Sequence, residues 1–142
     1  MNKFNLKELK LESYPLKTFD KIRYNDTDKQ LHVNNAVFST FIETGRNEFV
    51  YDPKNKLTSD STYVIASLSL DYIAEIIWPG TVDIGTAVSD IGNSSFKLLQ
   101  GVYQNGKVVA TAESVVVQVD DQTKRSKPLT EFNKILLSNH SL

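Results

Sequence analysis

The sequence contains no cysteine, no long hydrophobic run and no excess of charge of one sign. Without cysteine, the chain can form no disulfide, no cysteine-rich zinc site and no thiol nucleophile. The first residues contain no apolar core of signal-peptide length, and no later segment approaches the length of a membrane span. We therefore expect no membrane partner, and the cytoplasm is the default compartment.

The charge balance argues against a nucleic-acid partner. Sixteen Lys and Arg residues and 17 Asp and Glu residues give a formal net charge of -1, so the basic footprint of a nucleic-acid-binding protein is missing. With 142 residues, 40% of them hydrophobic and 23% charged, the chain matches one ordinary soluble domain. We expect a single domain over residues 1–142, with an N-terminal extension at 1–15 that docks on the body and a short C-terminal helix and tail at 128–142.

One segment has the periodicity of a long helix. Between Val37 and Phe49, apolar residues recur at spacings of three and four, as in a helix that buries one face, and the helix is predicted at about residues 35–51. Gly45 lies in its middle, where glycine costs about 1 kcal/mol relative to alanine. Another element is therefore expected to pack too closely there for a side chain. Pro53 marks the end of the predicted helix, because proline cannot continue a helix.

Much of the rest of the chain has the two-residue periodicity of strands. A first strand is predicted at 19–24, and four longer ones follow the helix at about 61–71, 81–88, 96–102 and 108–119. Asn105-Gly106 marks a hairpin, and connections this short exclude a doubly wound parallel sheet. The predicted fold class is therefore α+β, with one long helix against a curled antiparallel sheet of about five to six strands. A short helix is predicted at about 130–137.

Polar and titratable side chains are densest between the first strand and the helix, from Tyr24 to Asn35. This stretch, the corner, contains two aspartates, one of the two histidines of the chain and three asparagines, two of them adjacent at its end. Asn34 or Asn35 is a good N-cap, because a side-chain oxygen there can accept a hydrogen bond from the first turn. The partial positive charge and free N–H donors of a helix start favour a developing anion. The corner is therefore the candidate site.

Three runs in and after the corner form a recognisable pattern, namely Arg23-Tyr24-Asn25-Asp26-Thr27-Asp28, His32-Val33-Asn34-Asn35 and Phe41-Ile42-Glu43-Thr44-Gly45-Arg46. This pattern resembles the signature of the single-domain hot-dog-fold acyl thioesterases of the 4-hydroxybenzoyl-CoA thioesterase type. Later motifs follow in the family's usual order, namely Leu70-Asp71-Tyr72, Trp78-Pro79-Gly80, Ile91-Gly92-Asn93-Ser94-Ser95-Phe96, Val109-Ala110-Thr111-Ala112 and Pro128-Leu129. The spacing from the second aspartate to the histidine run is also similar to that in plant acyl-ACP thioesterases and bacterial long-chain acyl-CoA thioesterases. The resemblance covers roughly residues 16–129 and implies the hot-dog fold.

The resemblance also implies roles for the residues of the corner. Thioester hydrolysis needs a group that attacks the carbonyl or activates water, and donors that hold the oxyanion. Asp28 matches the family's catalytic aspartate, as general base or nucleophile, with an Asp-rich turn that caps its own backbone as the alternative. Asp26 is assigned to the turn. His32 matches a histidine of the acyl-ACP enzymes, and Asn34 is the third catalytic candidate. The residues expected to bind substrate are Gln30, Val33, Asn35 and Phe38.

Some positions depart from the family pattern. Many relatives have glycine where Leu31 stands, and the acyl-ACP enzymes have asparagine where Gln30 stands, so the choice between nucleophile and general base stays open. Glu43 and Arg46 are three residues apart on the predicted helix and are expected to form a surface pair. His140 is placed in a tail that is expected to fray.

No metal or cofactor is expected. An EF-hand loop beginning at Asp26 would need glycine at Leu31 and glutamate at Val37. A phosphotransferase Asp-x-Asp motif would need a parallel α/β sheet, whereas these strands are predicted to be antiparallel.

The expected function is hydrolysis of acyl-CoA or acyl-ACP thioesters, as in fatty acid metabolism, to a free acid and a thiol. Two alternatives stay open: a non-catalytic hot-dog module that binds an acyl ligand or only a sister subunit, and a hot-dog dehydratase that acts on hydroxyacyl carriers. A homodimer or a dimer of dimers is expected, with the substrate between subunits. The reason is that the far sheet edge and the 108–119 strand, apolar on both faces, are incompletely covered, and exposed strand edges pair with other chains.

Overall fold

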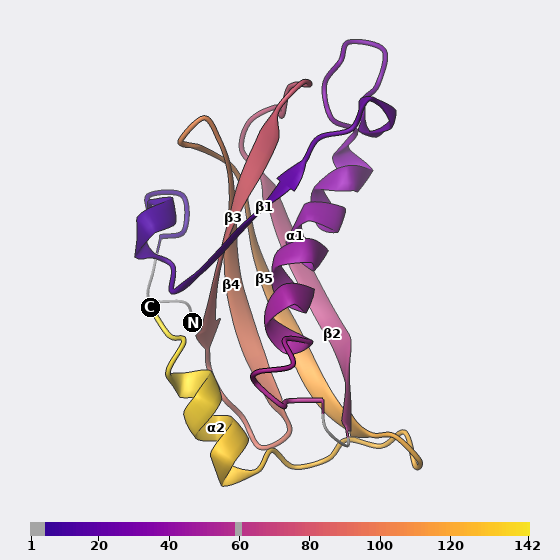
Figure 1. Ribbon diagram of the computed structural model, residues 1–142, viewed down its shortest axis with the longest axis vertical. Helices are drawn as coiled ribbons and strands as arrows, with labels where there is room; N and C mark the ends of the chain where they lie inside the picture. The colour runs from indigo at the N-terminus through magenta and orange to yellow at the C-terminus, as the bar shows by residue number, and fades with distance from the viewer. Residues whose placement is uncertain (1–4, 59–60) are drawn as a thin grey trace.

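The computed structural model describes residues 5–58 and 61–142, which form one curled antiparallel sheet with one long helix against it (Figure 1). The strands are β1 (Leu16–Lys21), β2 (Ser61–Tyr72), β3 (Thr81–Ser89), β4 (Ser95–Gln104) and β5 (Lys107–Asp120), the helices are α1 (Asn35–Val50) and α2 (Glu131–Ser138), and two 3₁₀ turns are η1 (Leu11–Ser13) and η2 (Tyr24–Asp26). The strand order is β1-β3-β4-β5-β2, so β1 and β2 are the edges. This arrangement confirms the predicted α+β hot-dog architecture, with five strands.

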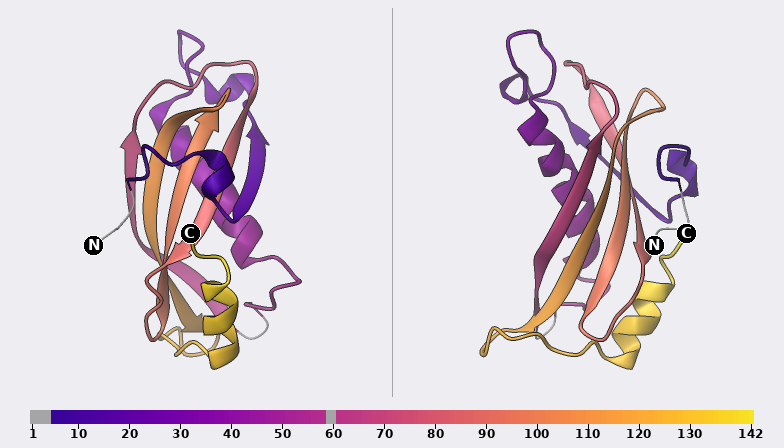
Figure 2. Two further views of the ribbon diagram at one scale, coloured as in Figure 1. Left: turned by 90° about the vertical axis from the view of Figure 1, so that its left-hand side faces the viewer. Right: turned by 180° about the vertical axis from the view of Figure 1, so that it is seen from behind.

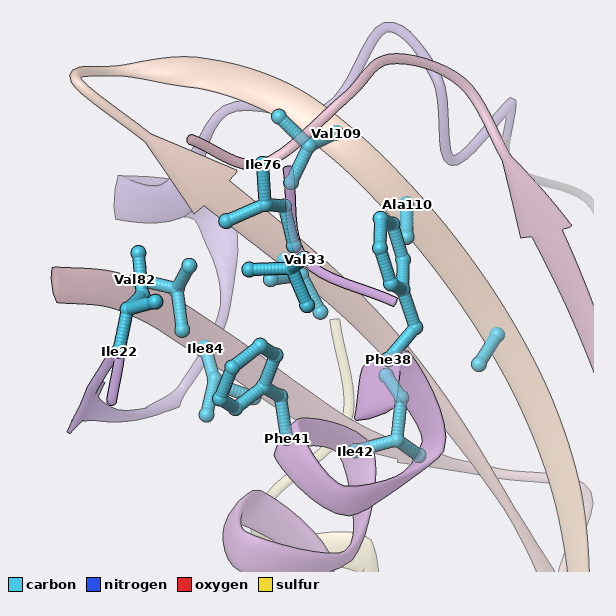
Figure 3. Close-up of a cluster of buried hydrophobic side chains, with 12 residues drawn as sticks. Ile22, Val33, Phe38, Phe41, Ile42, Ile76, Val82, Ile84, Val109 and Ala110 are labelled. Carbon is cyan, nitrogen blue, oxygen red and sulfur yellow. The ribbon is translucent and has the colours of Figure 1, made fainter. Parts of the chain in front are cut away.

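Two apolar clusters fill the space between α1 and the sheet. The first surrounds the first half of α1, where Phe38, Phe41 and Ile42 pack against residues of β3, β4 and β5. Val33 of the corner and Ile76 of the β2–β3 connection belong to the same cluster (Figure 3). The second cluster surrounds the end of α1 and includes side chains of α2. The segments around the candidate site are therefore anchored in the core.

Gly45 lies on α1 where the helix meets the sheet most closely. A Cβ atom added at this glycine would lie 2.6 Å from Ile84 Cγ2, 2.9 Å from Gln100 Nε2 and 3.1 Å from Thr86 Oγ1. The buried Gln100 amide donates to the Ile42 carbonyl and to the Thr86 hydroxyl, at 3.0 Å each. The predicted close approach at this glycine is thus confirmed.

The N-terminal segment packs on the side of the sheet opposite to α1 (Figure 2). Tyr14 is 1% exposed, and its ring meets that of Tyr103 edge to face, with 6.4 Å between centroids. The Tyr103 hydroxyl donates to the Leu9 carbonyl at 2.6 Å. Within its described part, from residue 5 onward, the extension therefore packs on the body of the sheet; residues 1–4 lie outside the described residues.

Two predictions need correction, one about the first strand and one about the C-terminal tail. The first strand ends at Lys21 and not at Tyr24, because the Asp26 carboxylate accepts a hydrogen bond from the Arg23 N–H and the chain turns there. The C-terminal tail does not fray at His140. The His140 Nδ1 lies 2.9 Å from the Leu136 carbonyl oxygen, and its ring packs on Phe49 with 5.0 Å between centroids.

The prediction left the far sheet edge and the 108–119 strand incompletely covered; in the structure, β2 is an edge strand of the sheet and β5 lies inside it. β5 lies between β4 and β2 and pairs with both, so its apolar residues are covered on the α1 side and half-covered on the other. β2 pairs on one side only within the described chain. It exposes Val64, Ile65, Leu68 and Tyr72. No described helix is both long enough and apolar enough to cross a bilayer.

Candidate active site

The corner that precedes α1 is held in place by the connection between β2 and β3. The Val33 N–H donates to the Ile76 carbonyl at 2.8 Å, and the Trp78 N–H donates to the Leu31 carbonyl at 3.1 Å. The corner residues that make these two bonds, Leu31 and Val33, are the direct neighbours of His32 in the sequence. They therefore fix the backbone of that histidine against a segment that is more than 40 residues away along the chain.

Asp26 is the structural member of the aspartate pair. It is 6% exposed, its Oδ2 accepts a hydrogen bond from the Arg23 N–H at 2.8 Å, and the Arg23 Nε lies 3.6 Å away. Its backbone carbonyl accepts the Asn34 N–H at 2.9 Å. Asp26 thus closes the η2 turn and ties it to the start of α1, in agreement with the turn role that the sequence predicts.

Asp28 is exposed and commits one carboxylate oxygen to local structure. Its Oδ1 accepts hydrogen bonds from the Gln30 N–H at 2.9 Å and from the His32 N–H at 3.3 Å, as in an Asx-turn. Within residues 5–58 and 61–142, no donor binds Oδ2. The alternative of an aspartate that caps its own backbone therefore accounts for one oxygen, and the other can take a proton or a ligand.

Leu31 has left-handed backbone, with φ of 62°. This conformation costs a residue with a side chain about 1–2 kcal/mol, and glycine adopts it freely. The local hydrogen bonds need this turn, since the Leu31 carbonyl accepts from Trp78 and the Leu31 N–H donates to the Asp28 carbonyl at 3.3 Å. This conformation explains why many members of the family that the chain resembles have glycine at this position. In this chain, a leucine adopts the same conformation.

His32 is oriented by Glu75, a residue that the sequence analysis missed. The His32 Nδ1 lies 3.1 Å from Glu75 Oε1, and the two side chains are 27% and 67% exposed. An imidazole that donates from Nδ1 to a carboxylate presents Nε2 as the free nitrogen. The one signal available in the sequence was an acidic residue three positions after the Leu70-Asp71-Tyr72 motif, within a run that is otherwise apolar.

The start of α1 presents the backbone N–H of Asn35 as a hydrogen-bond donor. Asn34 is the N-cap, and its Oδ1 accepts from the Ala36 N–H at 3.0 Å while its carbonyl accepts from the Val37 N–H at 2.8 Å. The Asn35 carbonyl accepts a bond from the Tyr72 hydroxyl at 3.2 Å. In the described part of the chain, the Asn35 N–H has no acceptor, so it is a donor that the helix start can offer to a ligand.

These groups surround one pocket of about 410 Å³, a volume within the range of small-molecule sites. The lining consists of Asp28, Gln30, His32, Val33, Asn35, Phe38, Tyr72, Ile73, Ala74 and Glu75. Six of the seven predicted site residues meet here, and Asn34 does not, because its side chain caps the helix. The last four lining residues come from the end of β2 and the connection after it, and the sequence analysis did not assign them to the site. Phe38 and Tyr72 form an apolar wall, with ring centroids 5.1 Å apart.

The Glu43–Arg46 pair is not the predicted surface pair. Glu43 Oε2 lies 3.9 Å from Arg46 Nη2, and Glu43 is exposed, but Arg46 is only 7% exposed. Helical spacing predicted the pairing correctly. It could not show that Arg46 faces the sheet.

Comparisons with known proteins agree with this geometry. The model of the thioesterase-like superfamily matches residues 22–136. A predicted thioesterase from Bacillus stearothermophilus is 27% identical, with a TM-score of 0.80 over 89% of this chain and 96% of that one. A thioesterase from Thermus thermophilus, solved with coenzyme A and Zn, is also 27% identical, with a TM-score of 0.78 over 90% and 95% of the two chains. A 1,4-dihydroxy-2-naphthoyl-CoA thioesterase from Synechocystis, 13% identical, has the same fold, with a TM-score of 0.74 over 87% and 96%. No curated protein matches the sequence.

The region matched by the family model contains η2, α1 and the strands β2 to β5, and therefore the whole pocket. Among the described residues of this chain, no group of three or more His, Asp or Glu side chains is arranged to hold a metal ion. The fold, the corner and the family model all agree, and the chain belongs to the thioesterase-like superfamily.

Proposed function

We propose that this protein hydrolyses acyl-CoA thioesters to a carboxylic acid and free CoA, in the pocket between the corner and the end of β2. One observation carries the proposal: the free oxygen of Asp28, the oriented ring of His32 and the open N–H of Asn35 belong to residues that line the same pocket. The solved relative from Thermus thermophilus holds coenzyme A, which supports CoA as the carrier. Acyl-ACP is the second carrier to be tested.

Asp28 is the base in this proposal. Its Oδ2 takes a proton from a water molecule, and the water oxygen attacks the carbonyl carbon of the thioester. The oxyanion that forms accepts a hydrogen bond from the Asn35 N–H, at the positive end of α1. The carbon–sulfur bond then breaks, the electron pair leaves with sulfur, and the proton passes to the thiolate. Asn34 acts indirectly, because it caps the turn that carries this N–H.

Direct attack by Asp28 is the alternative route. The carboxylate would form an anhydride with the acyl group, and water would hydrolyse it in a second step. A single turnover in isotopically labelled water separates the routes. In the anhydride route, attack of water on Cγ of Asp28 leaves label in Asp28. The general-base route places label only in the product acid.

His32 and Glu75 have a positioning role. Because Nδ1 faces the Glu75 carboxylate, Nε2 is left to accept a hydrogen bond from the attacking water. Glu75 is 67% exposed, so the electrostatic gain of the pair is small. Its effect is to hold the ring and its tautomer. Gln30 and the Asn35 side chain supply polar contacts for the carrier end of the substrate, while Val33 and Phe38 supply the apolar side for the acyl group.

We also propose that the working unit is at least a homodimer, formed through β2. The edge of β2 that has no partner strand among the described residues ends at Tyr72, which is 52% exposed and lines the pocket. A second copy paired along β2 would therefore border the substrate. Light scattering at low micromolar concentration is expected to give a dimer or a tetramer. A fully active monomer would overturn this arrangement.

The direct test is thiol release from a panel of short, long and aromatic acyl-CoA substrates, with matched acyl-ACP substrates beside them. Wild type is expected to hydrolyse at least one acyl-CoA, and Asp28→Asn is expected to lose about 10²–10⁴-fold in rate. If a folded, oligomeric preparation releases no thiol from any substrate, a non-catalytic acyl-binding module is the better account. The dehydratase alternative is excluded if hydroxyacyl-CoA is hydrolysed and not dehydrated.

A further inference from the structure

Gln104 is the last residue of β4, and its side chain reaches the β2–β3 connection. The hairpin after it, the connection and the corner lie at the same end of the molecule (Figure 1). Its backbone is fixed by that hairpin, where Asn105 and Gly106 have φ of 54° and 79°, as in a type I′ turn. The Gln104 Oε1 accepts a hydrogen bond from the Ile77 N–H at 3.0 Å, and its Nε2 donates to the Ile77 carbonyl at 2.7 Å. One side chain thus pairs with both backbone groups of one residue.

Ile77 lies directly opposite His32 of the corner. The two residues form an antiparallel bridge whose two hydrogen bonds come from the residues on either side of them. In an antiparallel ladder, a pair of this kind directs its own N–H and C=O groups away from its partner. The backbone groups of Ile77 therefore face the side remote from the corner, where Gln104 binds both.

The segment 75–79 is held in place by few hydrogen bonds. Within residues 5–58 and 61–142, its backbone forms hydrogen bonds only with the corner and with Gln104. Ile76 is fully buried and anchors the segment in the core, but apolar packing is not directional. The Gln104 amide therefore sets the direction in which the peptide groups around Ile77 face.

We propose that Gln104 is a positioning residue for thioester hydrolysis. It fixes Ile77, the bonds beside Ile77 fix the backbone of His32, and the His32 N–H donates to the Asp28 carboxylate at 3.3 Å. The role in catalysis rests on the proposed function. Glutamine suits it, because its amide has an acceptor and a donor side by side, the complement of a peptide N–H and C=O.

The location of this contact separates its effect on rate from its effect on stability. Ile77 is 52% exposed, and both hydrogen bonds lie at the surface. Water can replace such bonds, so they contribute little to the free energy of unfolding. A displacement of reacting groups by about 1 Å, in contrast, can cost about 10²-fold in rate. Loss of the amide is therefore expected to change turnover more than stability.

The first measurement is the kinetics of Gln104→Met, which keeps the length of the side chain and removes both hydrogen bonds. With the acyl-CoA that wild type hydrolyses fastest, we expect kcat per folded molecule to fall about tenfold. KM should stay the same, because Gln104 does not line the active-site pocket. Gln104→Glu is the second variant and serves alone if Gln104→Met does not fold. At neutral pH it places a carboxylate against the Ile77 carbonyl, so its kcat should fall at least as far.

The second measurement does not depend on activity. Amide hydrogen exchange of Val33 and Trp78, followed by NMR, reports on the two hydrogen bonds between the corner and the connection. Gln104→Met is expected to speed exchange at these two amides at least about tenfold, as local opening becomes easier. The exchange of α1 amides and the melting temperature should stay close to those of wild type.

Gln118 provides the matched control, because its amide also holds a connection but at the other end of the β2–β5 ladder. Its Nε2 donates to the carbonyls of Lys127 and Pro128 at 3.0 Å each, and its Oε1 accepts from the Tyr63 hydroxyl at 2.9 Å. Gln118 is 1% exposed, so Gln118→Met is expected to lower the melting temperature. Its kcat per folded molecule and the exchange in the corner should not change.

Three results would overturn the positioning role. The first is a Gln104→Met protein with the kcat of wild type. The second is a fall in kcat without faster exchange at Val33 and Trp78, which would show that Gln104 does not act through the corner. The third is a change confined to KM, which would place Gln104 in substrate binding. If wild type hydrolyses no acyl-CoA, the proposed function fails, and the exchange measurement alone decides: faster exchange shows that Gln104 holds the corner, and unchanged exchange shows that it does not.

Discussion

The start and the middle of α1 are built in opposite ways. At the start, exposed polar groups keep unused hydrogen-bonding capacity, as the free oxygen of Asp28 and the N–H of Asn35 show. In the middle, Gly45 brings the helix so close to Ile84 and Gln100 that even a methyl group would clash. The contrast indicates that close packing in the middle fixes the helix against the sheet, which lets its start hold reactive groups without burying them.

The largest change in stability is expected at the middle of the helix. Gly45→Val forces three carbon atoms into a gap where a single Cβ would already lie 2.6 Å from Ile84. Overpacking of this kind typically costs about 1–3 kcal/mol, and we expect about 3 kcal/mol in the free energy of unfolding, measured by urea denaturation. Gly45→Ala is the milder control, because part of its clash is offset by a helix propensity about 1 kcal/mol better. If Gly45→Val were as stable as wild type, close packing at Gly45 would not be what fixes α1 against the sheet.

A smaller effect, on activity alone, is expected at the start of the helix. Glu75→Gln removes the carboxylate that orients His32, and we expect kcat/KM to fall about tenfold, at the lower end of general acid–base effects. The free energy of unfolding should stay the same, because exposed ion pairs contribute little. The control is Glu48→Gln, an exposed glutamate of α1 outside the active-site pocket. If Glu75→Gln works at the parent rate, the orientation of His32 is not needed for hydrolysis.

The smallest effect is expected at Leu31, where the corner carries local strain. Leu31→Gly removes the cost of a side chain at φ of 62° but makes the unfolded chain more flexible, so we expect stability to be unchanged or higher by up to about 1 kcal/mol. Thiol release should be unaffected, since Leu31 does not line the pocket. A clear loss of stability on thermal unfolding would mean that packing of the half-exposed leucine outweighs its backbone strain.

The sequence predicted those parts of the site that depend on neighbouring residues. The cap at Asn34, the helix after it and the close approach at Gly45 follow from local propensities, and the family motifs added roles for Asp28 and His32. Glu75 was missed because it reaches His32 only when the β2–β3 connection folds back on the corner. Two-residue periodicity identified the strands but could not order them, so it could not show that β2 is an edge strand and that β5 lies inside the sheet.

The central claim is that Asp28 takes part in the reaction as the base, whereas Asp26, only two residues away, stabilises the turn before α1. The most direct test measures kcat/KM and the free energy of unfolding for Asp28→Asn and Asp26→Asn in parallel. We predict that Asp28→Asn loses about 10²–10⁴-fold in kcat/KM at unchanged stability. Asp26→Asn should lose about 1–3 kcal/mol of stability, the cost of disturbing a buried hydrogen-bonded group, while its folded fraction keeps turnover close to that of wild type. Full turnover by Asp28→Asn, or lost turnover by Asp26→Asn at unchanged stability, would contradict the account.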